Sequence, residues 1–379
     1  MREILFSAPD ITDNEIAAVE EVIRSGWLAH GKYSKKLEAL FCEFTGAQYA
    51  TAVSNCTAGL HLSCLAAGFG PGDEVIVPAQ THTATAHAVE YTGAKAVFAD
   101  VDPLTANMTV TEMEKRCTAA TKGVIPVHMA GYPCDMPAIT SMCKEKRLVL
   151  IEDCAHAIGT MCNGLHAGNY GFAGSFSFYP TKQITTGEGG VVISNDENII
   201  GKMKNLKAFG IDTPPEMRIR PGVYDVQGLG YNYRMTDFQA ALGVGQMERY
   251  RDNLGVRKLN GKRYAERLTS VDGVRCPEYS EDNSYFLFQV VFDEYINRDR
   301  ILRNLRDKGV GVSIHYATPV PLMTYYRRKY GCTEKEFPNA VRYGHQSLSL
   351  PVHAKITESD IDYICSTIQD NIQEKQHGE

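Results

Sequence analysis

The stretch GDEVIVPAQTHTATAHAVEYTGAKAVFADV, residues 72–101, decides the class of the fold. Its two runs rich in β-branched residues, 73–78 and 94–101, predict strands, and residues 83–93 between them predict a helix. A strand, a helix and a second strand in this order are typical of two parallel strands joined by a crossover helix. The stretch therefore predicts an α/β fold built on parallel strands.

The same alternation continues on both sides of this unit. Strand patterns also occur at residues 49–54, 122–128 and 148–153, each followed by a loop and a helical segment. From about residue 13 to 245 we therefore expect a mostly parallel sheet with helices on both faces. Ligands of such sheets bind in the loops at the carboxyl ends of the strands.

The pattern changes in the last third of the chain. A long polar helix is expected over residues 249–270, then antiparallel-looking strands at 284–292 and 311–316, and a closing helix from about Thr357. A chain of 379 residues is also long for a single core. We predict a large domain, residues 1–245, and a smaller α+β C-terminal domain, residues 246–379.

The composition is that of an ordinary globular protein, with 44% hydrophobic and 22% charged residues. The net charge of -6 with interspersed signs leaves no basic stripe, so we expect neither nucleic acid nor a membrane surface as a partner. No apolar run approaches membrane-spanning length, and the first residues do not resemble a signal peptide. Eleven cysteines without a C-x-x-C pair indicate reduced thiols and a cytoplasmic protein, and eleven histidines without ligand spacing predict no metal site.

The first of three unusual loops is AVSNCTAGLHL, residues 52–62, where a strand ends and a helix is expected to begin at Thr57 and Ala58. A helix start offers free backbone N–H groups and the positive end of the helix dipole, which favour an anion such as phosphate. By itself the loop favours the plainer alternative, in which Thr57 only caps the helix.

The second loop is LVLIEDCAHAIG, residues 148–159, with Glu152 and Asp153 at the end of a strongly apolar strand. An acid at a buried strand end is costly unless it meets a cation or a protonated donor. Asp153 therefore predicts a positively charged partner, and His156 follows on the same loop or the first helical turn. The alternative is a structural Asp153 that caps this helix.

The third loop is SFSFYPTKQITTGEGG, residues 175–190. Its aromatic alternation over residues 175–179 predicts a half-buried strand, and its three glycines allow close approach of the backbone. Lys182 lies between this strand and the next, at 189–194, where burial would lower its pKa and raise its nucleophilicity. Taken alone the loop is a weak signal, because most lysines are exposed.

Together the three loops are far more specific. An anion-binding helix start, a buried carboxylate and a nucleophilic lysine are the parts that hold pyridoxal 5′-phosphate (PLP). They would act as phosphate anchor, partner of the pyridinium nitrogen and Schiff-base lysine. We therefore expect residues 1–245 to form a cofactor-binding domain.

Nearly end to end, the chain resembles the DegT/DnrJ/EryC1/StrS aminotransferases, the sugar-aminotransferase branch of the fold type I PLP enzymes. The segments at 175–190 and at 230–243, GYNYRMTDFQAALG, carry the most specific part of the resemblance. It implies a fold type I PLP-transferase, with a mostly parallel central sheet in the large domain and a smaller α+β domain.

The resemblance also implies roles for residues around the cofactor ring. The family's Schiff-base lysine corresponds to Lys182, and the carboxylate that pairs with the ring nitrogen corresponds to Asp153. His82 takes the position of an aromatic ring that lies against the cofactor face. His156 takes the position near the ring hydroxyl.

Phosphate contacts follow from the resemblance in the same way. They fall on the backbone amides of Thr57 and Ala58, on the hydroxyl of Ser177, and on Asn232, which reaches the phosphate from the partner subunit. The last match implies a homodimer with shared active sites.

The activity that the resemblance implies is transamination. An amino acid, glutamate by family habit, would convert PLP to pyridoxamine 5′-phosphate (PMP), which then aminates a keto-sugar, most often a nucleotide-linked 4-keto or 3-keto-6-deoxy sugar. The alternatives are a cyclitol or small phosphorylated ketone as acceptor, a dehydratase, or a regulatory protein of the same family. Lys182 argues against the dehydratase, which has His at that position. A basic run at residues 327–329 suits a diphosphate, although a solvated helix is the commoner case.

Overall fold

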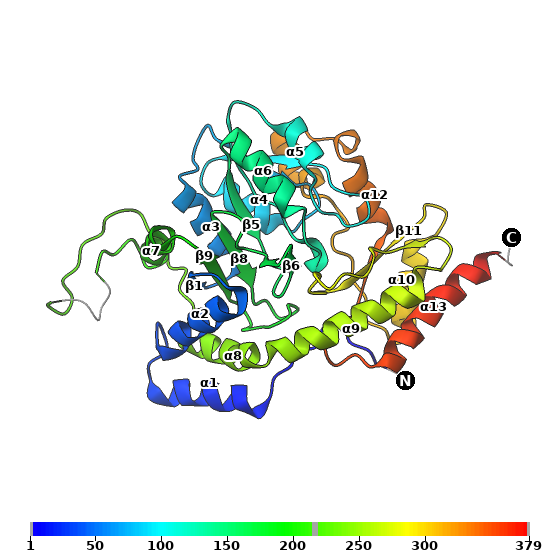
Figure 1. The fold of residues 1–379 in the computed structure, drawn as a ribbon, viewed down its shortest axis with the longest axis horizontal. Coiled ribbons are helices and arrows are strands. Elements are labelled where there is room, and N and C mark those ends of the chain that lie inside the picture. Colours follow the sequence, from blue (N-terminus) through cyan, green and yellow to red (C-terminus); the bar gives the residue numbers. More distant parts are fainter. Residues whose placement is uncertain (1–2, 214–218, 377–379) are drawn as a thin grey trace.

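The computed structural model describes residues 3–213 and 219–376, and its centre is a seven-stranded sheet between layers of helices (Figure 1). In spatial order the strands are β1 (Tyr49–Val53), β9 (Gly190–Ser194), β8 (Ala173–Ser177), β5 (Val149–Asp153), β4 (Thr121–Val124), β2 (Glu74–Pro78) and β3 (Lys95–Ala99). All neighbours from β3 to β8 pair in parallel, whereas β9 runs against both β8 and β1. The predicted α/β fold with a mostly parallel sheet is confirmed.

Helices cover both faces of this sheet because its strands alternate apolar side chains between them. In β9, Val191 and Ile193 pack with the layer of α2 and α8, whereas Val192 packs with the layer of α3 and α7. The first layer comprises α2 (Lys32–Thr45), α5 (Val110–Arg116), α6 (Met136–Lys146) and α8 (Asp237–Glu248). The second comprises α3 (Cys56–Ala67), α4 (Thr83–Glu90) and α7 (Glu197–Leu206).

The two N-terminal helices each end at a glycine. The first, α1 (Asp13–Ser25), stops at Gly26 with φ 71°, and α2 stops at Gly46 with φ 76°. Glycine adopts this left-handed conformation without strain and so terminates helices. Figure 1 shows α1 and α2 beside α8 at the lower edge of the molecule.

The C-terminal part has its own hydrophobic core. The long helix α9 (Tyr250–Leu268) and the terminal helix α13 (Glu358–Gln376) pack together beside a small antiparallel sheet (Figure 1). The sheet consists of β10 (Val274–Arg275), β11 (Phe288–Phe292) and β12 (Ser347–Leu350), and further helices are α10 (Arg298–Asp307), α11 (Thr324–Tyr330) and α12 (Pro338–Gln346). The division of the chain at residue 246 stays a prediction.

Several strand predictions were wrong in detail. Of the expected strand 284–292 only Phe288–Phe292 forms β11, and the strand expected over 122–128 ends at Val124. The segment 311–316 is not a strand, because only Ser313 pairs with β12, through Ser349. At the start of the segment, Gly311 donates its amide to the carbonyl of Ile4 at 2.7 Å, and His315 near its end lines a cavity. The strand expected over 175–179 ends at Ser177, and β8 is fully buried rather than half-buried because helices cover both of its faces.

The carboxyl ends of β1, β2, β5 and β8 lie at one edge of the sheet, and all three unusual loops gather there. Among the helices that the structure describes, none is both long enough and apolar enough to cross a bilayer.

Candidate active site

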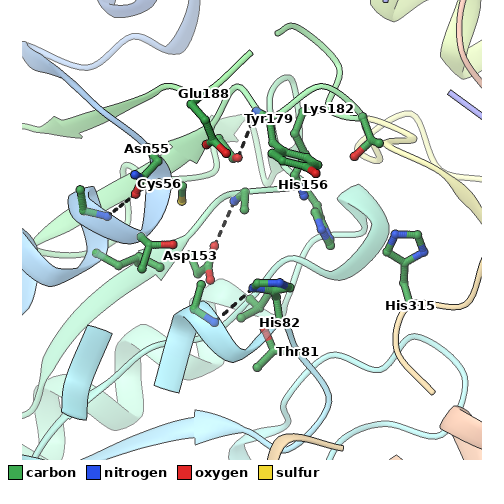
Figure 2. A pocket seen from close by; sticks show the side chains of 18 of the residues that line it. Asn55, Cys56, Thr81, His82, Asp153, His156, Tyr179, Lys182, Glu188 and His315 are labelled. Atoms are coloured by element: carbon green, nitrogen blue, oxygen red, sulfur yellow. Dashed lines mark hydrogen bonds between the residues drawn. The ribbon is translucent and has the colours of Figure 1, made fainter. Parts of the chain in front are cut away.

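A cavity of 660 Å³ opens at this edge of the sheet (Figure 2). The start of α3 forms one wall, the start of α4 a second, and the loop after β8 a third, while Asp153 at the end of β5 lies between them. His315 and Tyr316 come from the C-terminal part and close the remaining side. The structure thus brings together residues that lie far apart in the sequence.

Asp153 is buried, and its two carboxylate oxygens each accept one hydrogen bond. Thr85 donates its hydroxyl to Oδ2 at 2.8 Å, and the amide of Ala155 donates to Oδ1 at 3.1 Å. Burial raises the pKa of Asp153, while these two donors and the charge of Lys182 lower it. No lysine, arginine or histidine in the described ranges forms an ion pair with Asp153. The predicted cationic partner is therefore not one of the described side chains. The predicted helix cap is also wrong, because no helix follows residue 153 directly.

Lys182 faces the same cavity from the loop after β8 (Figure 2). Its Nζ lies 4.4 Å from the ring centroid of Phe286, which comes from the segment before β11. Burial lowers the pKa of Lys182 to about 8, against smaller opposing effects of Cys56 and Asp153. A lysine of this kind is partly unprotonated near neutral pH and is therefore a better nucleophile than an exposed one.

The start of α3 and the end of β8 form a polar corner of the cavity. Thr57, Ala58 and Ser177 all line it. The helix begins at Cys56 and its N-cap is Asn55, whose Oδ1 accepts the amide of Ala58 at 2.8 Å, so the alternative of Thr57 as N-cap is wrong. In this structure the Ala58 amide is therefore already paired. The Ser177 hydroxyl accepts the Tyr179 amide at 3.4 Å and keeps its own proton to donate.

Two histidines flank the space in front of Asp153. His82 caps α4, where its Nδ1 accepts the Ala84 amide at 3.2 Å. The ring of His156 stacks on Phe286 with centroids 4.3 Å apart, and its Nδ1 accepts a backbone amide at 3.3 Å. Burial lowers the pKa of both histidines, and the charge of Lys182 adds to this effect. Both rings are therefore neutral and can lie against a flat ligand.

Asn232 does not line the cavity of its own chain. The flanking rings of Tyr231 and Tyr233 point inward, stack on each other and pack against His61 of α3. Asn232 is exposed between them, and its Oδ1 accepts a hydrogen bond from Arg234 Nε at 3.0 Å. This alternation directs Asn232 away from the interior of its own chain.

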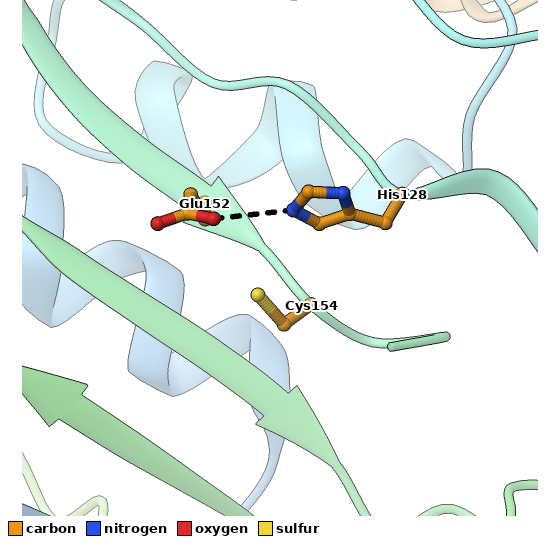
Figure 3. A group of neighbouring side chains, drawn as sticks. All are labelled: His128, Glu152 and Cys154. Carbon is orange, nitrogen blue, oxygen red and sulfur yellow. Dashed lines mark hydrogen bonds and ion pairs between the residues drawn. The ribbon is translucent and has the colours of Figure 1, made fainter. Parts of the chain in front are cut away.

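A further group of chemically active side chains lies behind Asp153. The ligand atoms of His128, Glu152 and Cys154 are within 4.8 Å of one another, and all three residues are buried (Figure 3). His128 Nε2 lies 3.2 Å from Glu152, and the same carboxylate accepts three amides from residues 168–171. Because these bonds already occupy the carboxylate, we assign the group a structural role at the end of β5 and no metal.

Several residues of the site were not predicted. Thr85 lies three residues after His82 in α4, and this helical spacing was a usable signal because it puts both side chains on one face. Asn55, two residues before the predicted helix start, was a second usable signal, since Asn is a preferred N-cap. Phe286 carried no local signal, because only the folded chain brings it beneath Lys182.

The residues present fit PLP. The buried carboxylate of Asp153, with two donors and no cation of its own, suits a protonated ring nitrogen. The helix start of α3 and the Ser177 hydroxyl suit a phosphate, and the pKa of Lys182, lowered to about 8, suits attack on an aldehyde.

Comparison with known proteins is consistent with this fit. The model of the DegT/DnrJ/EryC1/StrS aminotransferase family matches residues 9–369. The spore coat polysaccharide biosynthesis protein SpsC of Bacillus subtilis (strain 168) is 36% identical over 374 residues, which cover 96% of each chain. GDP-perosamine synthase of Escherichia coli O157:H7 is 34% identical over 377 residues, which cover 99% of this chain and 100% of the relative. The PLP form of Spr1654 from Streptococcus pneumoniae has a TM-score of 0.91 and 30% identity, over 98% of this chain and 99% of that one.

Proposed function

The chain belongs to the DegT/DnrJ/EryC1/StrS aminotransferase family, and from this premise we propose that it transfers an amino group from glutamate to a nucleotide-linked keto-sugar. It is a PLP-dependent aminotransferase, and PMP is the form of the cofactor between the two half-reactions. The observation that carries the proposal is that one cavity is lined both by Asp153, which is buried without an ion-pair partner among the described residues, and by Lys182, whose pKa is lowered.

The similarity to GDP-perosamine synthase supports a sugar nucleotide as acceptor, and the family name supports the reaction type. The basic run 327–329 gives less support than its charge suggested. Lys329 pairs with Glu90 on α4, and Arg327 lies 3.7 Å from Glu334. We therefore leave this run out of the proposed site.

Each residue of the cavity has a defined task in this proposal. PLP, when bound, supplies the electron sink for the cleaved Cα–H bond of the amino donor. Lys182 would anchor the cofactor and then, as a free amine, move the proton from the donor's α-carbon, a role that suits its pKa of about 8. Asp153, held by Thr85 and the Ala155 amide, would keep a proton on the ring nitrogen.

The remaining side chains would bind and orient. The start of α3 at Thr57 and Ala58 and the Ser177 hydroxyl would hold the phosphate, with the Ala58 amide exchanging its bond to Asn55. His82 would lie against one face of the ring. His156, neutral and held by its stack on Phe286, would lie near the ring hydroxyl.

We also propose that the enzyme is a homodimer with shared active sites. Asn232 projects away from its own cavity, so a phosphate contact from it needs a second chain. Residues 219–229, shortly before Asn232, extend from the body of the molecule (Figure 1). They expose the apolar side chains of Ile219, Val223, Val226 and Leu229. Exposed apolar side chains gathered on one segment are typical of a surface that another protein covers.

A half-reaction assay tests the acceptor and the donor separately. Glutamate added to the PLP-loaded enzyme should bleach the visible absorption of the Lys182-bound cofactor, because PMP is left behind. The true keto-sugar nucleotide should then restore the absorption. If only a cyclitol ketone or a small ketone phosphate restores it, the proposed acceptor is wrong, and if glutamate fails to bleach it, the proposed donor is wrong.

A further inference from the structure

Residues 4–10, which we call the N-terminal strap, connect the C-terminal part of the chain to the loop that carries Lys182. Ile4 donates its amide to the carbonyl of Gly309 at 2.8 Å and accepts the amide of Gly311 at 2.7 Å. Further along the strap, the carbonyl of Leu5 lies 2.9 Å from His353 Nε2. Ser7 donates its hydroxyl to the carbonyl of Thr181, next to Lys182, at 3.3 Å.

Between these anchor points, Phe6 lies directly behind the active-site cavity. Its ring stacks on the imidazole of His315, with centroids 5.6 Å apart and planes 21° from parallel. Phe6 also packs against the small apolar cluster that contains Phe286, the residue beneath Lys182. The strap therefore does not line the cavity itself but contacts residues that do, His315 through Phe6 and Thr181 through Ser7.

His315 is held on its other sides as well. Its Nδ1 lies 3.0 Å from the Ser349 hydroxyl, and Phe286 meets the ring edge-on with centroids 6.0 Å apart. The remaining surface of the ring lines the cavity, beyond His156 as seen in Figure 2. Since Ser349 occupies Nδ1, Nε2 is the nitrogen left to meet a ligand.

The surroundings of His315 keep it neutral. Burial lowers the pKa of His315 to about 3, and the positive charge of Lys182 adds to this effect. His156 is a further neighbour, with its ring centroid 6.4 Å away. A neutral imidazole fixed at Nδ1 can donate or accept one hydrogen bond at Nε2 without adding charge to the cavity.

We propose that Phe6 is a positioning residue for the acceptor, because it holds His315 with Nε2 toward the bound ketone substrate. This inference rests on the proposed function, since the acceptor must enter the cavity that His315 lines. The Phe6 ring covers one face of the imidazole, so its removal would admit water and allow the ring to turn.

The ionisation of His315 provides a test that needs no substrate. In the wild-type enzyme the Cε1–H resonance of His315, assigned by its loss in His315→Gln, should not titrate between about pH 5 and 9. In Phe6→Ala it should titrate with a midpoint closer to the ordinary value of about 6.5, because water now solvates the charged form. Leu5→Ala is the matched control, because the Leu5 side chain is exposed and only its backbone carbonyl is used.

Kinetics test the second half of the proposal. Phe6→Ala should raise KM for the acceptor about tenfold, the value of one well-placed hydrogen bond. Bleaching by glutamate should be unchanged, whereas a general loss of structure would slow both half-reactions. Phe6→Leu keeps an apolar side chain over the imidazole, so it should leave His315 neutral. It is the variant to measure if Phe6→Ala does not fold.

The proposal is wrong if His315 stays unprotonated in Phe6→Ala and the acceptor KM stays within twofold of wild type. It is also wrong if the Leu5→Ala control changes His315 as much as Phe6→Ala does. Because the resonance is followed without substrate, a failure of the proposed acceptor leaves this result readable, and the two failures can be told apart.

Discussion

Asp153 and Lys182 both bear a cost that a bound cofactor would remove. Burial raises the pKa of Asp153 and lowers that of Lys182 to about 8, so each group resists its own charged form. A protonated ring nitrogen would offset the cost at Asp153, and covalent attachment would remove the ammonium charge at Lys182. At the scale of single residues, unfavourable electrostatics at Asp153 and Lys182 therefore favour the binding of PLP.

Replacing Asp153 by Asn should raise the Kd for PLP by about 10²-fold to nearly 10⁴-fold, because breaking a buried charge pair costs about 3–5 kcal/mol. Thr85→Val should raise the Kd about 10- to 100-fold, because it removes only one hydrogen bond to the carboxylate. Thr85→Ser keeps the hydroxyl and should restore binding. The measurement is a spectroscopic PLP titration, and an Asp153→Asn enzyme that binds PLP as wild type does would contradict the assignment.

The lowered pKa of Lys182 predicts how PLP binding depends on pH. In the cofactor-free protein half of the Lys182 amines should be unprotonated at about pH 8, so the rate of PLP attachment should rise with pH and level off above that value. The pKa of Lys182 is lower in the folded than in the unfolded state, so its protonated form lowers the free energy of unfolding below pH 8. This destabilisation disappears as the pH rises from 8 toward the pKa of the unfolded state. Stopped-flow absorbance checks the profile. A rise centred near the ordinary lysine pKa of about 10.4 would show that Lys182 is not the desolvated amine described above.

At the scale of elements, the start of α3 links stability to cofactor binding. Asn55→Ala removes the N-cap of α3 and should lower the free energy of unfolding of the cofactor-free protein by about 1 kcal/mol. Asn55→Asp keeps the cap acceptor but places a negative charge beside the proposed phosphate site, so it should keep stability and weaken PLP binding. Chemical denaturation and PLP titration of the two variants separate these effects. If Asn55→Asp binds PLP more tightly than wild type, the phosphate does not lie at this helix start.

Local patterns were sufficient to predict most elements and the three loops of the site. The strand end at Asp153 and the helix that follows His82 are properties of neighbouring residues, so the sequence alone predicts them. The strand before Lys182 was predicted too, but its end was placed at residue 179 instead of Ser177. The strand expected over 311–316 is wrong, because only Ser313 pairs with β12 and the amide of Gly311 bonds to Ile4, which is distant in sequence. The position of Phe286 beside Lys182 also depends on a tertiary contact, which the spacing of apolar residues along the chain does not predict.

At the scale of the whole molecule, the shared-site homodimer makes a quantitative prediction. Lys182→Ala and Asn232→Asp subunits should each be inactive as pure dimers, the second because its charge repels the phosphate. After denaturation and refolding of an equal mixture, about a quarter of the wild-type activity should return, because half of the dimers pair the two variants and each of these carries one intact site. If Asn232 acted within its own chain, mixing would restore nothing.

The central claim is that Lys182 carries the cofactor, and reduction with borohydride tests it most directly. The purified enzyme should be yellow, reduction should fix PLP covalently, and peptide mapping should place the label on the peptide that contains Lys182. The account predicts that Lys182→Ala protein, reduced in the same way, carries no covalent cofactor. A label on any other residue of the wild-type enzyme, or an undiminished label in Lys182→Ala, would contradict it.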